Sequence, residues 1–282
     1  MNRQCLLALC LPLFTAPQAF AQEQALPAVD PRADSVTIGV GGAYVPSYEG
    51  SDDYSVTPGA LVRGRISGIA FFTRGTNLFV DVFPDRDEDG WDIELGPAAN
   101  LRLDRTGGIK DPQVRALGKL DEAFELGGWA GIGKTGVFTS AYDNLSFRVS
   151  YLRDLGNVHD SYVISPSLEY GTPLSSTAYA GVSVSADYVG KGYGRTYFGV
   201  TPVGAAASGL SPYSVDDSGF KNVRLGGFFM HSLTGDLIRG GLSIGAGVSY
   251  SRLLGKYADS PVVAEAGDAD QWMAAAGLAY TF

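Results

Sequence analysis

The sequence predicts an all-β protein: a transmembrane, antiparallel, up-and-down β-barrel of about 12 strands. Long segments alternate strictly between apolar and polar residues, which indicates strands whose two faces meet different surroundings. Glycine is abundant at 38 of 282 residues, while only 18% of the residues are charged, so the composition is not that of a disordered chain. No apolar run reaches the ~18 residues of a membrane-spanning helix. These observations favour strands over helices as the membrane-spanning elements.

The first residues of the chain have the pattern of a secretory signal peptide. Arg3 provides the positive charge, residues 6–14 form a short apolar segment, and Ala19-Phe20-Ala21 fits the cleavage site. Both cysteines lie within this segment, so the mature chain is expected to contain none. The predicted organisation is a cleaved signal peptide at 1–21, an N-terminal periplasmic segment at 22–34 and an outer-membrane β-barrel at 35–282.

The alternating segments have the length and the aromatic ends that a membrane-spanning strand requires. Residues 91–104 place Trp91 and Ile93 on one face and Asp92 and Glu94 on the other. Several such segments exceed ten residues, and a tilted strand needs about 9–11 to cross a bilayer. Tyrosine, tryptophan and phenylalanine lie near the ends of the apolar faces, where interfacial girdles belong. A soluble β-sandwich would also alternate, but it explains the long strands and the terminal aromatic residues poorly.

Alternation and turn residues give a specific set of strands. The expected strands are 35–45, 56–65, 67–73, 77–83, 90–104, 122–136, 143–154, 161–172, 176–188, 220–232, 237–250 and 271–282. With both termini periplasmic, the long connections lie on one side of the membrane and the short ones on the other, as in bacterial barrels. The strands expected before residue 84 are short, and the segment 196–203 could form a hairpin within a loop.

Charged residues on the inward faces are the main candidates for a functional site. Alternation assigns to the lumen Asp92, Glu94, Arg102, Glu125, Arg148, Glu169, Asp187, Arg224 and Arg239. Barrels of about eight strands fill their interiors and barrels of 16–18 strands leave a channel, so side chains decide the outcome for 12. These charges could form a structural ion-pair network or line a narrow solute path.

Other patterns provide little evidence of catalysis or of ligand binding. His159 and His231 are the chain's two histidines: His159 lies in a predicted outer loop beside Asp160 and Ser161, and His231 is directly followed by Ser232, so alternation sends that pair to opposite faces. The protein is therefore predicted not to be an enzyme and to have no cofactor. Residues 85–90 resemble the first half of a calcium-binding loop but lack its final glutamate, so a polar hairpin turn is the alternative. Asp111-Pro112 could begin a short helix or a turn. The net charge of −9 disfavours nucleic acid.

Several motifs resemble those of the MipA/OmpV family of outer-membrane proteins. Its opening signature is matched by Pro46, Tyr48, Gly50, Ser51, Asp52, Asp53 and Tyr54, directly after the first strand. The end of the chain matches at 259–263 and at Tyr280-Thr281-Phe282, where Tyr280 and Phe282 resemble the C-terminal signal of outer-membrane assembly. The resemblance covers essentially the whole mature chain.

The resemblance implies a monomeric barrel in the Gram-negative outer membrane, exported with a cleaved signal peptide and in contact with outer-membrane lipid. It also implies a non-enzymatic scaffold that binds a lytic transglycosylase and a murein synthase during murein (peptidoglycan) remodelling. A narrow porin or solute-binding barrel with a charged lumen is the alternative. Adhesion through the long loops at 189–219 and 251–270 is a third reading.

Overall fold

A computed structural model describes residues 34–83, 90–236 and 239–282. The predicted signal peptide and most of the calcium-like turn at 85–90 lie outside these residues. The strands are β1 (Ser35–Pro46), β2 (Tyr54–Ile66), β3 (Ile69–Arg74), β4 (Asn77–Asp81), β5 (Trp91–Arg102), β6 (Ala123–Thr135), β7 (Asn144–Asp154), β8 (Tyr162–Pro173), β9 (Ala178–Val189), β10 (Gly219–Ser232), β11 (Gly241–Leu253) and β12 (Asp270–Thr281). The helices are α1 (Pro112–Ala116), α2 (Lys191–Phe198), α3 (Pro202–Ser208) and α4 (Pro261–Ala264), and a 3₁₀ turn, η1, spans Gly255–Tyr257.

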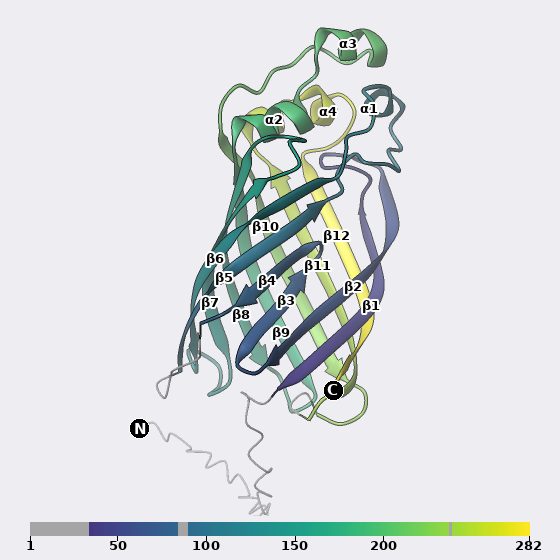
Figure 1. Ribbon diagram of the computed structural model, residues 1–282. Coiled ribbons are helices and arrows are strands. Elements are labelled where there is room, and N and C mark those ends of the chain that lie inside the picture. The colour runs from purple at the N-terminus through teal and green to yellow at the C-terminus, as the bar shows by residue number, and fades with distance from the viewer. Residues whose placement is uncertain (1–33, 84–89, 237–238) are drawn as a thin grey trace, which may run out of the picture. The chain divides into compact units, whose positions relative to one another are not determined.

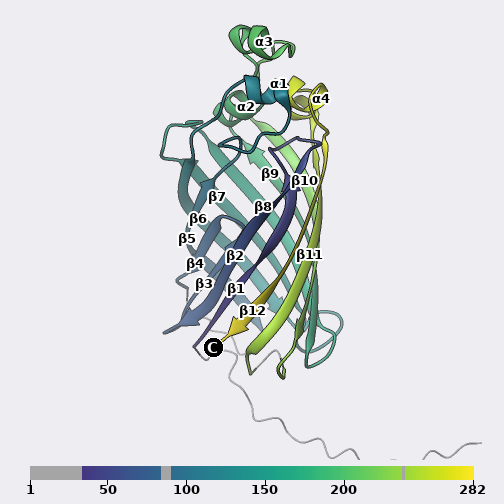
Figure 2. The ribbon, with the colours of Figure 1, turned by 90° about the vertical axis from the view of Figure 1, so that its right-hand side faces the viewer.

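Each strand pairs antiparallel with its neighbours in sequence, and β1 pairs with β12 to close the barrel (Figure 1). The predicted 12-stranded antiparallel barrel is therefore confirmed. The helices gather at one end of the barrel, and the C-terminus lies at the other (Figures 1 and 2). None of the described helices has both the length and the apolar character needed to cross a membrane.

The outer surface of the barrel is apolar, because alternation turns the aliphatic residues of each strand outward. Val40 is 65% exposed and Leu278, its partner on β12, is 47% exposed. Aromatic pairs lie near both ends of this surface: Tyr250 and Trp272 stand 5.1 Å apart toward the helices, and Tyr280 lies near the C-terminus. An apolar band between aromatic girdles is the surface that a bilayer requires.

The β3–β4 hairpin is shorter than the other strand pairs, so β2 is paired on both sides only near its C-terminal end. The last pair of the β2–β3 ladder is Arg63 with Phe72. At the next position the Thr73 side chain takes over, because its hydroxyl accepts from the Val62 N–H (3.0 Å) and donates to the Val62 carbonyl (3.2 Å). Beyond it, residues 56–61 are exposed on both faces. Pro58 lies in this edge segment, where a residue without an N–H is tolerated.

Two connections differ from the sequence-based expectation. The segment 196–203 is not a hairpin, because it continues α2 to Phe198 and Val200 then forms an isolated bridge with Tyr213. β11 begins at Gly241 rather than at 237, because Gly240 (φ 80°) and Gly241 (φ 95°) adopt left-handed backbone conformations that interrupt a strand.

Candidate functional site in the lumen and its lid

The connections at the helical end pack into a lid, defined as residues 47–53, 103–122, 155–161, 190–218 and 254–269. Its centre is aromatic: the rings of Tyr193 and Tyr197 lie 4.6 Å apart, and those of Phe198 and Tyr257 lie 5.3 Å apart. All four side chains are fully buried. Buried aromatic rings in mutual contact are typical of a protein core. The lid is therefore a packed layer and not a set of free loops.

The local sequence explains how the lid folds. Asp111 caps α1 by accepting from the Val114 N–H at 2.8 Å, so the Asp111-Pro112 pair does begin a helix. Thr201 and Ser260 cap α3 and α4 in the same way, each followed by a proline in the first turn. Ser260 also donates to the Phe198 carbonyl at 2.6 Å, which ties α4 to the end of α2.

The family-signature loop forms the part of the lid that joins the first hairpin to the last strand. The buried Tyr48 hydroxyl donates to the carbonyls of Val262 and Ala266. Gly50, at φ 98°, donates its N–H to the Gln271 side chain at 3.1 Å. The other members of the signature make local contacts. The buried Ser51 hydroxyl bonds the Ser47 hydroxyl, and the Asp53 carbonyl accepts from the Ser47 N–H. Asp52 is exposed, Tyr54 stacks on Tyr44, and Pro46 is the last residue of β1. The signature therefore supports lid structure.

Beneath the lid, charged side chains from four strands form an upper network. Arg102 on β5 bonds Glu125 on β6 at 2.8 Å, and the same carboxylate lies 2.9 Å from Nε2 of His159. Lys221 on β10 lies 3.5 Å from Asp187 on β9. Glu125, His159 and Lys221 are buried. In such surroundings an unpaired charge costs several kcal/mol, so each member depends on its partners.

The lid completes this network from above. Glu49 of the signature loop bonds Lys221 at 2.5 Å, and the Tyr193 hydroxyl donates to Glu49 at 2.7 Å. Arg102 in turn donates to the Tyr193 hydroxyl at 3.0 Å. Lid and lumen thus share one hydrogen-bonded system, and opening the lid would break ion pairs as well as apolar contacts.

Two acidic groups of the lid titrate differently because of these contacts. Burial favours a raised pKa for Glu49, but Lys221 outweighs it and holds the pKa of Glu49 below its usual range. Burial and the nearby Glu49 carboxylate raise the pKa of Asp104 to about 6, although the Glu49 N–H donates to Asp104 at 2.7 Å. Asp104 is thus the lid carboxyl that changes charge near neutral pH.

A second group of charges lies lower in the lumen and has no lid contact. Arg148 on β7 bonds Glu94 on β5 at 2.5 Å and Glu169 on β8 at 2.8 Å. Arg74, at the tip of the β3–β4 hairpin, also bonds Glu169. Arg148 further lies 5.9 Å from the ring of Trp129. This lower network holds the hairpin to the opposite side of the barrel.

The remaining predicted lumen charges are placed less centrally, and one is not in the lumen. Asp92 lies on the lumen face opposite Gly133, and Arg224 lies there opposite Ser185. Arg239 does not: it precedes β11, is about half exposed, and its N–H donates to Asp236 in the turn at 2.7 Å. Its assignment to the lumen was wrong, because Gly240 and Gly241 separate residue 239 from the alternation of β11.

The sequence did not single out Glu49, Lys221 or Tyr193 as members of a lumen network. The two-residue period would place Lys221 on the outer face of β10. A β-bulge between Phe220 and Asn222 shifts the register, so residue 221 lies on the lumen face instead. Glu49 and Tyr193 lie in connections, where no period assigns a direction. The one sequence signal close to Glu49 was the family signature, because Glu49 lies between its members Tyr48 and Gly50.

One side of the lumen is lined by small residues. Gly41 on β1 faces Gly59 on β2 and Gly277 on β12, and Gly277 faces Gly245 on β11. An added Cβ at Gly59 would meet nothing within 4 Å. At Gly41 and Gly277, in contrast, an added Cβ would lie 2.2 Å from the Ala276 carbonyl oxygen and 2.5 Å from the Val40 carbonyl oxygen, so this wall of small residues is closely packed between neighbouring strands.

The described residues show no arrangement typical of catalysis or of a metal site. His159 is bonded to Glu125 under the lid, and His231 stacks on Phe229 with ring centroids 6.5 Å apart. No serine or threonine hydroxyl among the described residues bonds either histidine, and no group of three potential metal-ligating side chains was found there. The site is thus a set of ion pairs, with no assembled nucleophile and base.

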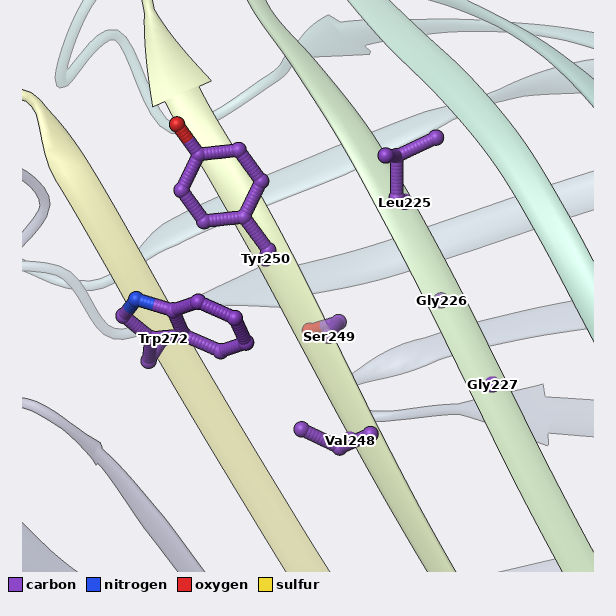
Figure 3. A pocket seen from close by; sticks show the side chains of 7 residues that line it. All are labelled: Leu225, Gly226, Gly227, Val248, Ser249, Tyr250 and Trp272. Atoms are coloured by element: carbon purple, nitrogen blue, oxygen red, sulfur yellow. The ribbon is translucent and has the colours of Figure 1, made fainter.

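The lipid-facing wall carries a shallow hollow of about 340 Å³ beside the aromatic girdle (Figure 3). Leu225, Val248, Tyr250 and Trp272 surround it, and Gly227 forms its floor without a side chain. Register places these residues on the outward face. At the C-terminal end, Tyr280 packs on Phe282 at 4.7 Å on the same surface. An apolar hollow here is suited to lipid chains.

Comparison with known proteins identifies the family. A family model described as MltA-interacting protein MipA matches residues 38–282. No curated protein matches the chain. Among solved structures, the chain is similar to an anion-selective porin from Comamonas acidovorans (10% identity, 89% of this chain and 99% of that one, TM-score 0.37). It is also similar to the outer-membrane expressed OmpT of Vibrio cholerae (8% identity, 89% and 97%, TM-score 0.34). The match over nearly all of the described barrel shows that this chain belongs to the MltA-interacting protein MipA family of outer-membrane β-barrels.

Proposed function

We propose that this protein is a non-enzymatic scaffold of the outer membrane that binds a lytic transglycosylase and a murein synthase. The family match over residues 38–282, whose description names an interaction with MltA, is the observation that carries the proposal. A signal peptide at 1–21 would direct the chain to the Gram-negative outer membrane. There the barrel would function as a monomer, with its C-terminal end in the periplasm and its lid outside.

The packed lid supports a binding role over transport. Solute entering from the lid side would have to displace buried aromatic rings and the ion pairs that Glu49 and Tyr193 make with the lumen. A scaffold needs no such passage. A closed lid also gives a rigid barrel, from which short turns at the other end can be presented to a partner.

The turn between β6 and β7 is the best partner surface among the described turns at that end. The Asp143 carboxylate accepts from the N–H groups of Val137 (2.6 Å), Phe138 (2.9 Å) and Thr139 (2.6 Å), so the turn has one conformation. These bonds hold the pKa of Asp143 below its usual range. The turn exposes Phe138 and Tyr142, the latter by 78%. Rigid, exposed aromatic residues are typical anchors of protein interfaces.

Binding of the full-length protein in detergent to a purified MltA-type lytic transglycosylase tests the scaffold. We expect wild type to bind and the F138S/Y142S variant to bind roughly tenfold more weakly, the effect of losing an aromatic anchor. A matched control, L174S/L233S, removes two exposed apolar residues from other turns at the same end and should bind as wild type. Absence of wild-type binding would overturn the proposal, and equal loss in the control would overturn the assignment of the surface.

A narrow porin or solute-binding barrel is the second candidate, favoured by the small residues that line one side of the lumen. Single-channel conductance of refolded protein in a planar bilayer distinguishes the two. Steady ohmic steps would support the porin, with Glu94, Arg148 and Glu169 as the first residues to mutate for selectivity. A silent bilayer containing folded protein would support the closed scaffold.

A further inference from the structure

A polar pocket of about 320 Å³ lies at the rim of the barrel, between the β7–β8 connection and the start of α2. Arg153, His159, Tyr162, Lys191 and Arg195 are among the residues that line it. It is separate from the networks of the lumen, except that His159 contributes to its wall from below. Neither the proposed scaffold role nor the alternative porin role uses this pocket.

The pocket is locally positive in a chain whose net charge is −9. Three of its lining residues are cationic, and Asp160, 3.2 Å from Arg153, is its acidic group. Lys191 and Arg195 are exposed and form no hydrogen bond or ion pair through their side chains with any described residue. The buried Nδ1 of His159 likewise has no hydrogen-bond partner among the described residues. The Lys191 and Arg195 side chains can therefore still bind a ligand in the pocket.

The placement of Lys191 and Arg195 is unfavourable for α2 in the absence of an anion. They stand four residues apart, and like charges at this spacing destabilise a helix by about 0.2–0.5 kcal/mol. Lys191 is also the first residue of the helix, where a positive charge opposes the helix dipole. Gly190 provides no capping side chain, and the first turn contains no acidic residue. A bound anion would relieve all three conditions at once.

The position of the pocket indicates where that anion would come from. Tyr162 belongs both to the pocket and to the outward aromatic girdle, where it stacks on Tyr151 at 5.8 Å. Arg153 pairs with Tyr162 across β7 and β8. Girdle residues lie at the level of lipid headgroups, so the pocket opens at the depth at which headgroup phosphates occur.

We propose that this pocket binds the phosphate of a lipid headgroup, with Lys191, Arg195 and Arg153 as its cationic contacts. Arginine pairs with phosphate through two parallel N–H donors, and lysine provides a point charge. The free N–H groups at the start of α2 add donors that favour an anion. The close approach of α2 to the β7–β8 connection depends on Gly192, since an added Cβ would lie 2.2 Å from the His159 carbonyl oxygen.

Native mass spectrometry of the full-length protein in detergent tests this site, with phosphatidic acid as the probe, because its phosphomonoester is anionic and uncovered. Phosphatidylcholine is the comparison, because its choline cation covers and neutralises a phosphodiester. We expect wild type to retain phosphatidic acid, and K191Q/R195Q to bind it about tenfold more weakly, for a loss of two charge-assisted contacts. Phosphatidylcholine binding should not change. Both residues are exposed, so the variant should fold, and a heat-dependent shift in gel mobility checks this.

The control variant R115Q/K119Q removes two exposed cations at the same spacing from another part of the lid. It should bind phosphatidic acid as wild type. Equal loss in the control would show general charge attraction and overturn the site, as would undiminished binding by K191Q/R195Q. If inorganic phosphate alone bound as tightly and with the same dependence on Lys191 and Arg195, the site would serve a soluble phosphate and the lipid assignment would be wrong.

Discussion

The upper and lower networks of the lumen use the same residue types but differ in what surrounds them. In the upper network, Glu125 is completely buried and lies beneath the lid. In the lower network, the side chains of Glu94 and Glu169 are 9% and 25% exposed, while the arginines of the two networks are alike at 18% for Arg102 and 19% for Arg148, so the difference lies in the carboxylates. Charges cost more to leave unpaired where water is excluded. The upper network should therefore contribute to stability mainly by keeping each charge paired, and the lower one should tolerate change.

The two networks also differ in redundancy. Arg148 has two carboxylate partners, whereas Arg102 has one direct carboxylate partner, Glu125. Loss of Glu94 or Glu169 therefore leaves Arg148 a second carboxylate, whereas loss of Glu125 leaves Arg102 with the Tyr193 hydroxyl as its remaining hydrogen-bond partner among the described residues. Matched substitutions at the two levels test whether burial and redundancy, and not ion pairing as such, set the effect.

The largest effect is expected from Glu125→Ala. Without this carboxylate, Arg102, Asn100 and His159 each lose a partner in a buried site. Breaking a buried ion pair on one side costs about 3–5 kcal/mol. Urea unfolding of the protein in micelles should show a free energy of unfolding lower by this amount, with earlier proteolysis of the lid. A loss below 1 kcal/mol would contradict the role of burial.

Glu94→Ala is the matched change in the lower network, and we expect a smaller loss of about 1–3 kcal/mol. Arg148 would keep Glu169 as a direct carboxylate partner, which offsets part of the loss. The same urea experiment applies, and proteolysis of the lid should be unchanged. If Glu94→Ala destabilised the protein as much as Glu125→Ala, the contrast between the two levels would be wrong.

The sequence predicted the 12-stranded barrel, which the closed sheet confirms, because the two-residue period of a strand is readable in the chain. Glu94, Glu125 and Arg148 need only that period to be placed on the lumen face. Lys221 was not singled out because a bulge shifts the period beside it, and Arg239 was assigned to the lumen although two left-handed glycines separate it from β11. These are local backbone events that alternation alone does not reveal.

The lid could not be predicted in the same way. The contacts of Glu49 with Lys221 and of Tyr193 with Arg102 join residues that are far apart in sequence and lie in irregular segments. Their geometry depends on how several connections pack together. A helix cap such as Asp111 could be predicted from the sequence because it bonds a residue three positions away. The upper network could not, because its members are far apart in sequence.

The stability of the closed lid should depend on pH, and the effect should be smaller than that of the mutations. Since the folded state raises the pKa of Asp104 to about 6, it binds this proton more tightly than the unfolded state does. The closed lid should then lose stability as pH rises from about 4 to 6, after which the loss is complete. Glu49, whose pKa is lowered, remains ionised over most of that range and contributes little change there.

Hydrogen exchange of the segment 103–111, corrected for the intrinsic effect of pH, measures this dependence. Protection should fall between pH 4.5 and pH 6.5 in wild type, and Asp104→Asn should show a flatter profile while still accepting from the Glu49 N–H. An equally steep profile in the variant would show that another group controls the lid. The strands around Arg148 should show no comparable change.

The smallest effect is expected where the lower network meets the short hairpin. Trp129 donates its ring N–H to the Val80 carbonyl at 3.0 Å, and this carbonyl passes over Gly96, where an added Cβ would lie 2.0 Å from it. Trp129→Phe removes the donor and keeps most of the ring, so we expect a loss of about 0.5–1.5 kcal/mol in urea unfolding and faster exchange at 78–82. Trp272→Phe, on the lipid face, should leave exchange there unchanged. Equal exchange in the two variants would mean that β4 is held by its strand pairing alone and that the aromatic side of the lower network does not anchor the hairpin.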